Sequence, residues 1–98
     1  MPNSITGSVA KVGAKGQLIT DISVAQVADA PHDENFQVKF GGHETFGLFP
    51  TEHQQPASTM VASEGASGFI EIEIVGISLS EMLGIRENEA VEVIWPSA

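Results

Sequence analysis

The sequence predicts an all-β fold: a small antiparallel barrel or sandwich of about 6–7 strands with one short helix near residues 78–84. Two observations predict it. Short segments of alternating apolar and polar residues recur at roughly 8–12-residue spacing, separated by turn-forming residues. Helical periodicity occurs in one segment, which argues against an alternating βαβ sheet. At 98 residues with 42% apolar side chains, the chain is the size of one domain, residues 1–98.

The first predicted hairpin joins strands at residues 5–12 and 17–24. Its second strand alternates, so Leu18, Thr20 and Ile22 share one face. Between the strands lies Gly-Ala-Lys-Gly, residues 13–16. Such a Gly-x-x-Gly loop clamps nucleic-acid backbones in KH domains, but that module needs a helical context. We therefore expect a plain hairpin turn whose glycines accept positive φ.

The middle of the chain predicts a loop followed by a second hairpin. Residues 25–35 are polar and acidic around Pro31, which is typical of a loop with at most one helical turn. Residues 36–40 read FQVKF and place alternate apolar side chains on one face. Gly41-Gly42 then predicts a two-residue turn, with a return strand over residues 43–49.

The C-terminal half contains the clearest strand and the helix. After an exposed loop at 50–56, a weak strand at 58–63 and a turn at 64–68, residues 69–75 read FIEIEIV. Ser78 has capping-box spacing to the glutamate three residues later, and Gly84 is a good helix end. Leu79, Met82 and Leu83 form an apolar stripe between them. A strand at 91–95 closes the chain.

Charge and composition exclude several classes of function. Thirteen acidic residues against four basic ones give a formal net charge of −9, which disfavours nucleic acid or an anionic membrane as a partner. The chain has no cysteine, so disulfides, thiol nucleophiles and zinc–thiolate sites are excluded. No segment has the apolar length of a signal peptide or a membrane helix. We expect a cytoplasmic protein.

Candidate catalytic side chains are sparse. We expect His32, His43 and His53 to be solvent-exposed in or near loops and not to bind a metal. Glu71 and Glu73 share a strand face, which indicates a solvated surface more than an acid–base pair. The serines include no Gly-x-Ser-x-Gly elbow, so a hydrolase triad has no support.

Three aromatic residues have positions of interest. Trp95 lies near the end of the last predicted strand, and we expect it in the core or at its rim. Phe46 and Phe49 lie close together before a proline. They fit either the core or a contact between subunits, and the sequence leaves both interpretations open.

Several segments together show a resemblance that covers nearly the whole chain. They are Gly13-Ala-Lys-Gly-Gln-Leu-Ile-Thr-Asp-Ile22, Gly65-Ala-Ser-Gly68 with FIEIEIV after it, Leu79-Ser-Glu-Met-Leu-Gly-Ile85 and Asn88-Glu-Ala-Val-Glu-Val93. In this order they resemble the C-terminal domain of the S-adenosylmethionine hydroxide adenosyltransferases, a family that includes fluorinating and chlorinating enzymes. The resemblance implies a closed, antiparallel, Greek-key-like barrel. It also implies trimers in which an adenosyl ligand lies between this domain and the N-terminal domain of the next subunit.

The departures from the family concern the ligand. The family's first motif reads Asp-x-Phe-Gly-Asn, in which the phenylalanine walls the pocket and the asparagine hydrogen-bonds adenine. Here Gly13, Lys15 and Gln17 occupy the aspartate, phenylalanine and asparagine positions. By resemblance, Gln17, Ser67 and Gly68 are the candidate ligand-binding residues, and no catalytic or metal-binding residue is assigned. The family's catalytic N-terminal domain has no counterpart in this chain, so we expect no cofactor beyond a possible adenosyl ligand.

These observations support two hypotheses about function. The first is a non-catalytic, stand-alone homologue of the barrel that acts as a binding or assembly module and self-associates. The second is a split half of an S-adenosylmethionine-using enzyme, which contributes an adenine-binding surface to a separately encoded catalytic domain. A plainer alternative is that the chain is a fragment of a longer protein, against which the initiating methionine argues weakly.

Overall fold

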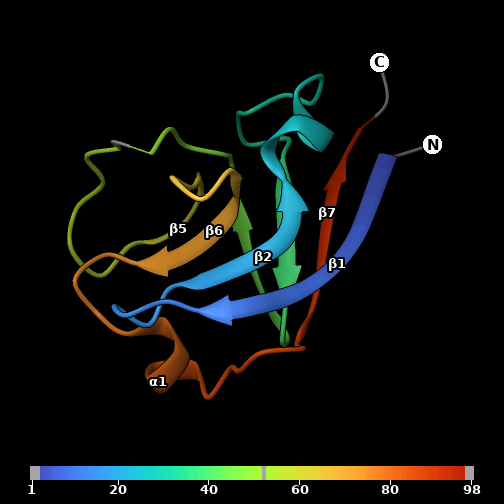
Figure 1. The fold of residues 1–98 in the computed structure, drawn as a ribbon. Helices are drawn as coiled ribbons and strands as arrows, with labels where there is room; N and C mark the ends of the chain where they lie inside the picture. Colours follow the sequence, from blue (N-terminus) through green and yellow to red (C-terminus); the bar gives the residue numbers. More distant parts are fainter. Residues whose placement is uncertain (1–2, 52, 97–98) are drawn as a thin grey trace.

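The computed structural model describes residues 3–51 and 53–96 of the chain. These residues form an all-β structure with one short α-helix, as the sequence predicts (Figure 1). In chain order the elements are β1 (Asn3–Val12), β2 (Leu18–Ser23), the 3-10 helix η1 (Val24–Val27), β3 (Gln37–Phe40), β4 (His43–Phe46), β5 (Met60–Glu64), β6 (Phe69–Ile74), α1 (Leu79–Leu83) and β7 (Ala90–Trp95).

The seven strands form a nearly closed antiparallel barrel in the order β4-β3-β7-β1-β2-β6-β5. Three hairpins supply the local pairs, and β7 returns from the end of the chain to lie between β1 and β3. This long-range return is the Greek-key-like feature that the family resemblance implies. Beyond β4, the Phe49 N–H donates to Ala62 O at 3.0 Å and the Glu64 N–H donates to Phe49 O at 2.8 Å. These bonds bring the two ends of the sheet together.

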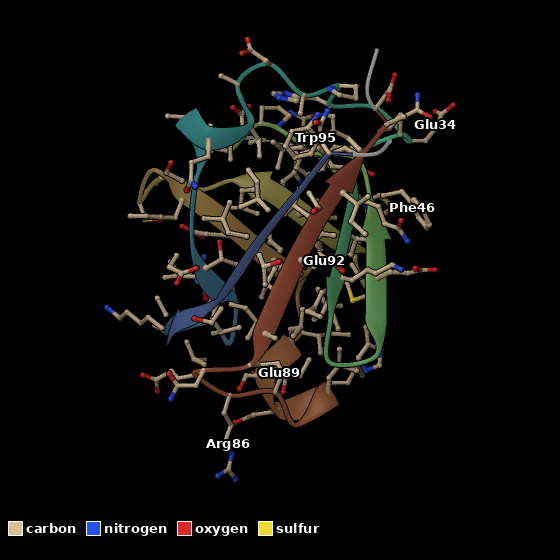
Figure 2. All side chains as sticks on the ribbon, turned by 90° about the vertical axis from the view of Figure 1, so that its right-hand side faces the viewer. Glu34, Phe46, Arg86, Glu89, Glu92 and Trp95 are labelled. Atoms are coloured by element: carbon tan, nitrogen blue, oxygen red, sulfur yellow. The ribbon has the colours of Figure 1, made fainter. Side chains whose placement is uncertain are left out.

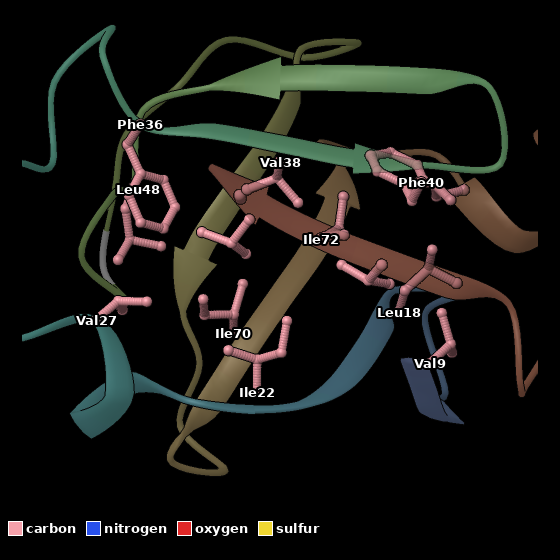
Figure 3. Close-up of a cluster of buried hydrophobic side chains, with 14 of the residues drawn as sticks. Val9, Leu18, Ile22, Val27, Phe36, Val38, Phe40, Leu48, Ile70 and Ile72 are labelled. Carbon is pink, nitrogen blue, oxygen red and sulfur yellow. The ribbon is translucent and has the colours of Figure 1, made fainter. Parts of the chain in front are cut away.

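The inward faces of the strands fill the barrel with aliphatic and aromatic side chains (Figure 3). Alternate residues of β6, Ile70, Ile72 and Ile74, are buried, which confirms the face expected from FIEIEIV. The predicted face of residues 36–40 is likewise buried. Burying one large apolar side chain contributes about 1.5–3 kcal/mol, so this core is the main source of stability.

Every predicted strand differs from the structure by one to three residues at an end, and two of these differences have a clear cause in the backbone. The return strand ends at Phe46 instead of residue 49, because Gly47 adopts a φ of +90° and directs the chain from β3 towards β5. The weak strand begins at Met60 instead of residue 58. Ser58 has a left-handed φ of +69° and donates its N–H to Val75 O, so it belongs to a turn.

The helix α1 begins and ends at the residues that the sequence indicates. Ser78 Oγ accepts the Glu81 N–H at 3.3 Å, and Gly84 closes the helix with a φ of +67°. The prediction that Met82 joins the buried stripe is wrong, since it is 60% exposed. Leu79 and Leu83 lie four positions apart on the inner side of this short helix, and Met82 falls off that side.

The turn between β1 and β2 packs directly on the start of α1 (Figure 1). Gly16 is buried there with a φ of +80°, and its carbonyl accepts the Ser80 N–H at 3.0 Å. A Cβ at Gly16 would lie 2.7 Å from the Ser78 Cα. The connection is therefore the hairpin turn that was expected, but of its two glycines only Gly16 has a positive φ, and Gly16 also makes a tertiary contact.

No helix within residues 3–51 and 53–96 has the length and apolar character needed to cross a bilayer.

Candidate functional site

A cleft of about 230 Å³ lies where the β1–β2 turn, the end of β6 and the start of α1 meet. Its lining residues are Lys15, Gln17, Glu73, Ile74, Gly76, Ile77 and Ser78. One of the three residues assigned by resemblance, Gln17, is therefore in a cleft. The wall formed by residues 74–77 is a tight turn in which the Ile77 N–H donates to Ile74 O at 3.0 Å.

Gln17 also holds its own turn together. Its Oε1 accepts the Lys15 N–H at 3.1 Å, while its backbone carbonyl accepts the Gly13 N–H at 2.8 Å. The carboxamide lies over Gly13, in the space that a Cβ at that position would occupy. Gly13 and Gln17 therefore fit each other, and the amide oxygen of Gln17 already has a partner. Its Nε2 group has no partner among the described residues, so it is the group still available to a ligand.

The prediction that all three histidines are exposed is confirmed for His32 but wrong for His53, and His43 is half-buried. The side chain of His53 is 8% exposed and contacts Glu73, with 2.6 Å between Nε2 and Oε1. Its Nδ1 lies 3.4 Å from the Gln55 backbone N–H, and its ring lies edge-on to Phe49 at 6.2 Å. With Nδ1 as acceptor, Nε2–H donates to the carboxylate. His53 thus helps to fix the position of Glu73, which lines the cleft.

Two side chains of opposite charge, Lys15 and Glu73, line this cleft without contacting each other. Lys15 is one of the four basic residues of the chain. Among the described residues, the one ion pair is that between His53 and Glu73. None of the described carboxylates therefore lies within 4.0 Å of the Lys15 amine. Ile74 is buried and Ile77 half-buried, so the cleft also contains apolar surface.

Ser67 and Gly68, the other residues assigned by resemblance, lie far from Gln17. In the pairing of β2 with β6, Leu18 lies opposite Ile72 and Ser23 lies opposite Phe69. Gln17 is therefore at one end of this pair and the 65–68 turn at the other, about 16 Å apart at the usual rise of a strand. Ser67 Oγ donates to Glu71 Oε2 at 2.9 Å, and Gly68 O accepts the Val24 N–H at 3.0 Å. The three residues do not form one site within a single chain.

The other side chains considered from the sequence are dispersed. His32 and His43 pack edge-on or tilted against Phe36 and Phe40, respectively. Trp95 is half-buried and stacks on Phe36 at 6.2 Å, which confirms a place at the rim of the core. Among the described residues, no group of three His, Asp or Glu side chains could hold a metal ion.

The two phenylalanines left open by the sequence have different environments. Phe49 is half-buried against His53. Phe46 is 54% exposed and projects outward from β4 (Figure 2). Phe46 is therefore available for a contact with another molecule.

The barrel is similar to parts of two longer proteins of known structure. No protein-family model and no curated protein matches the chain. An uncharacterized conserved protein from Thermotoga maritima is 21% identical with a TM-score of 0.73, over 92% of this chain and 35% of that one. A conserved hypothetical protein from Thermus thermophilus is 22% identical with a TM-score of 0.67, over 90% and 32%. The chain shares their fold. It spans about a third of the length of each.

Proposed function

We propose that the chain is a non-catalytic binding module that assembles with a second polypeptide surface, in the simplest case another copy of itself. The observation that carries the proposal is the length of the similar structures: each contains this barrel within a chain about three times as long. A barrel that forms one third of a chain commonly packs on the remainder. The exposed Phe46 on β4 and Met82 on α1 are apolar groups suited to such a contact.

Light scattering coupled to size-exclusion chromatography tests this proposal. We expect species larger than the 10.3 kDa monomer, with a mass that falls on dilution. Phe46→Ser should reduce association, since truncating a central anchor residue of an interface costs about 2 kcal/mol or more. Glu44→Ser, which changes another exposed position of β4, is the matched control and should associate like the unmodified chain. A monomer at every concentration would contradict self-association.

A second candidate function is the split enzyme half, and the position of Gln17 in the cleft favours it. Ligand pockets usually enclose about 300–1,000 Å³, whereas the cleft holds about 230 Å³. A nucleoside would therefore need a second wall, which a separate catalytic domain could provide. Gln17 still offers its Nε2 donor to a base, while its Oε1 is bound to the Lys15 N–H.

Calorimetric titration with adenosine and with S-adenosylmethionine tests the second candidate. We expect no binding to the chain alone, and binding when a co-purifying catalytic domain supplies the missing wall. Gln17→Ala should then weaken adenosine binding about fivefold or more, because it removes a hydrogen bond to the ligand. An unchanged affinity in Gln17→Ala would show that the base is not read by this residue.

A further inference from the structure

We infer that the cleft beside the β1–β2 turn binds a small zwitterion, specifically a free α-amino acid with an aliphatic side chain. The cleft contains one cation, one carboxylate and apolar surface, all contributed by residues that line the same space of about 230 Å³. This site is independent of the association proposed above, because it uses neither Phe46 nor Met82.

The charges of the cleft match both ends of such a ligand. Lys15 and Glu73 line the same cleft, yet the described residues contain no ion pair between them. Opposite charges that share a cleft without pairing can each receive the complementary charge of a ligand. A free amino acid has a carboxylate for Lys15 and an ammonium group for Glu73. A ligand with only one of these charges would leave the other side chain unmatched.

The position of Glu73 is fixed before a ligand arrives. His53 Nε2 lies 2.6 Å from Glu73 Oε1. The imidazole itself contacts the Gln55 N–H and the Phe49 ring. This leaves Oε2 of Glu73 for an ammonium group, since His53 contacts Oε1. A carboxylate held in one orientation loses less side-chain entropy on binding.

The remaining walls select an apolar, compact ligand. Ile74 and Ile77 contribute aliphatic surface, and the bond from Ile77 N–H to Ile74 O keeps their turn closed. Two neutral polar groups lie at the rim: the Nε2 group of Gln17 and the Ser78 hydroxyl, whose oxygen caps α1 and whose hydrogen remains free to donate. The small volume favours a single amino acid over a nucleoside or a peptide.

The test is a titration of the isotope-labelled chain with L-leucine, followed by the backbone amide signals of Gly76 and Ser78. We expect saturable shifts at these residues with a Kd of about 1 mM, a weak affinity consistent with a small open cleft. N-acetyl-L-leucine lacks the ammonium charge and L-leucinamide lacks the carboxylate. Each should bind about fivefold more weakly than L-leucine, because one ion pair is lost.

Variants that each remove one charge show which side chain binds which end of the amino acid. Glu73→Gln keeps an acceptor for His53 and should weaken L-leucine binding about fivefold, while N-acetyl-L-leucine, which has no ammonium group, should bind as before. Lys15→Met should weaken L-leucine binding similarly while preserving the backbone bond to Gln17. Glu71→Gln and Lys11→Met, outside the cleft, should bind like the unmodified chain. Equal binding of all three probes, or no shift with L-leucine, would overturn the inference and leave the association result unaffected.

Discussion

Gly16→Ala is expected to lower the free energy of unfolding by about 3 kcal/mol. Gly16 has a φ of +80°, which costs a residue with a Cβ about 1–2 kcal/mol. The new methyl group would also meet the Ser78 backbone, with 2.7 Å between Cβ and Cα. Either the β1–β2 turn or the start of α1 must move, and the bond from Ser80 N–H to Gly16 O would be strained. Thermal unfolding should shift by roughly 12 °C or more for a domain of this size.

Gly84→Ala separates the backbone cost of a positive φ from the cost of the close contact between the turn and α1. Gly84 also has a positive φ, +67°, but apart from the adjoining chain no described atom lies within 4 Å of the position a Cβ would take. Its replacement should cost about 1 kcal/mol, the backbone cost alone. If the two variants unfolded at the same temperature, the close packing of the turn on α1 would not contribute to stability.

The sequence predicts the strands of this fold better than their long-range order. The alternation of Ile70, Ile72 and Ile74 is local, and it specifies both a strand and its buried face. The place of β7 between β1 and β3 depends on pairs such as Ile5 with Val93, which are distant in the chain. No local pattern encodes that pairing, although the strand count and the family resemblance both favour a barrel. One further local signal is present in the sequence: Ser23 and Gln26 form a complete capping box at η1.

The candidate site was predictable in part. The resemblance indicated Gln17, which does line the cleft, but it also grouped Gln17 with Ser67 and Gly68 at the far end of β6. The contact between His53 and Glu73 joins a loop residue to a strand residue twenty positions later. The strand alternation alone indicated that Glu73 was solvated. Only the placement of His53 against β6 brings the imidazole to the carboxylate, and the residues around His53 carry no periodic signal for it.

Thr20→Val is expected to lower the free energy of unfolding by about 2–3 kcal/mol, although it preserves side-chain shape. Thr20 is fully buried, and the pairing of β2 with β6 is irregular between Ile19 and Ser23. There the Thr20 hydroxyl donates to Ile70 O at 2.7 Å and accepts the Ile22 N–H at 3.2 Å. Valine would leave two buried backbone groups without this partner. Denaturant unfolding at unchanged m-value measures the loss.

Thr45→Val also removes a buried hydroxyl, but here we expect the free energy of unfolding to rise. Thr45 on β4 is 5% exposed, and its Oγ1 is buried without a hydrogen-bond partner in the described structure. Valine should therefore stabilise the fold by about 1 kcal/mol, because it removes an unpaired buried hydroxyl. Thr20→Ser retains the bridging hydroxyl and should cost about 1 kcal/mol for the lost methyl group. Equal effects of valine at both positions would mean that the hydroxyl of Thr20 does not support the irregular part of the sheet.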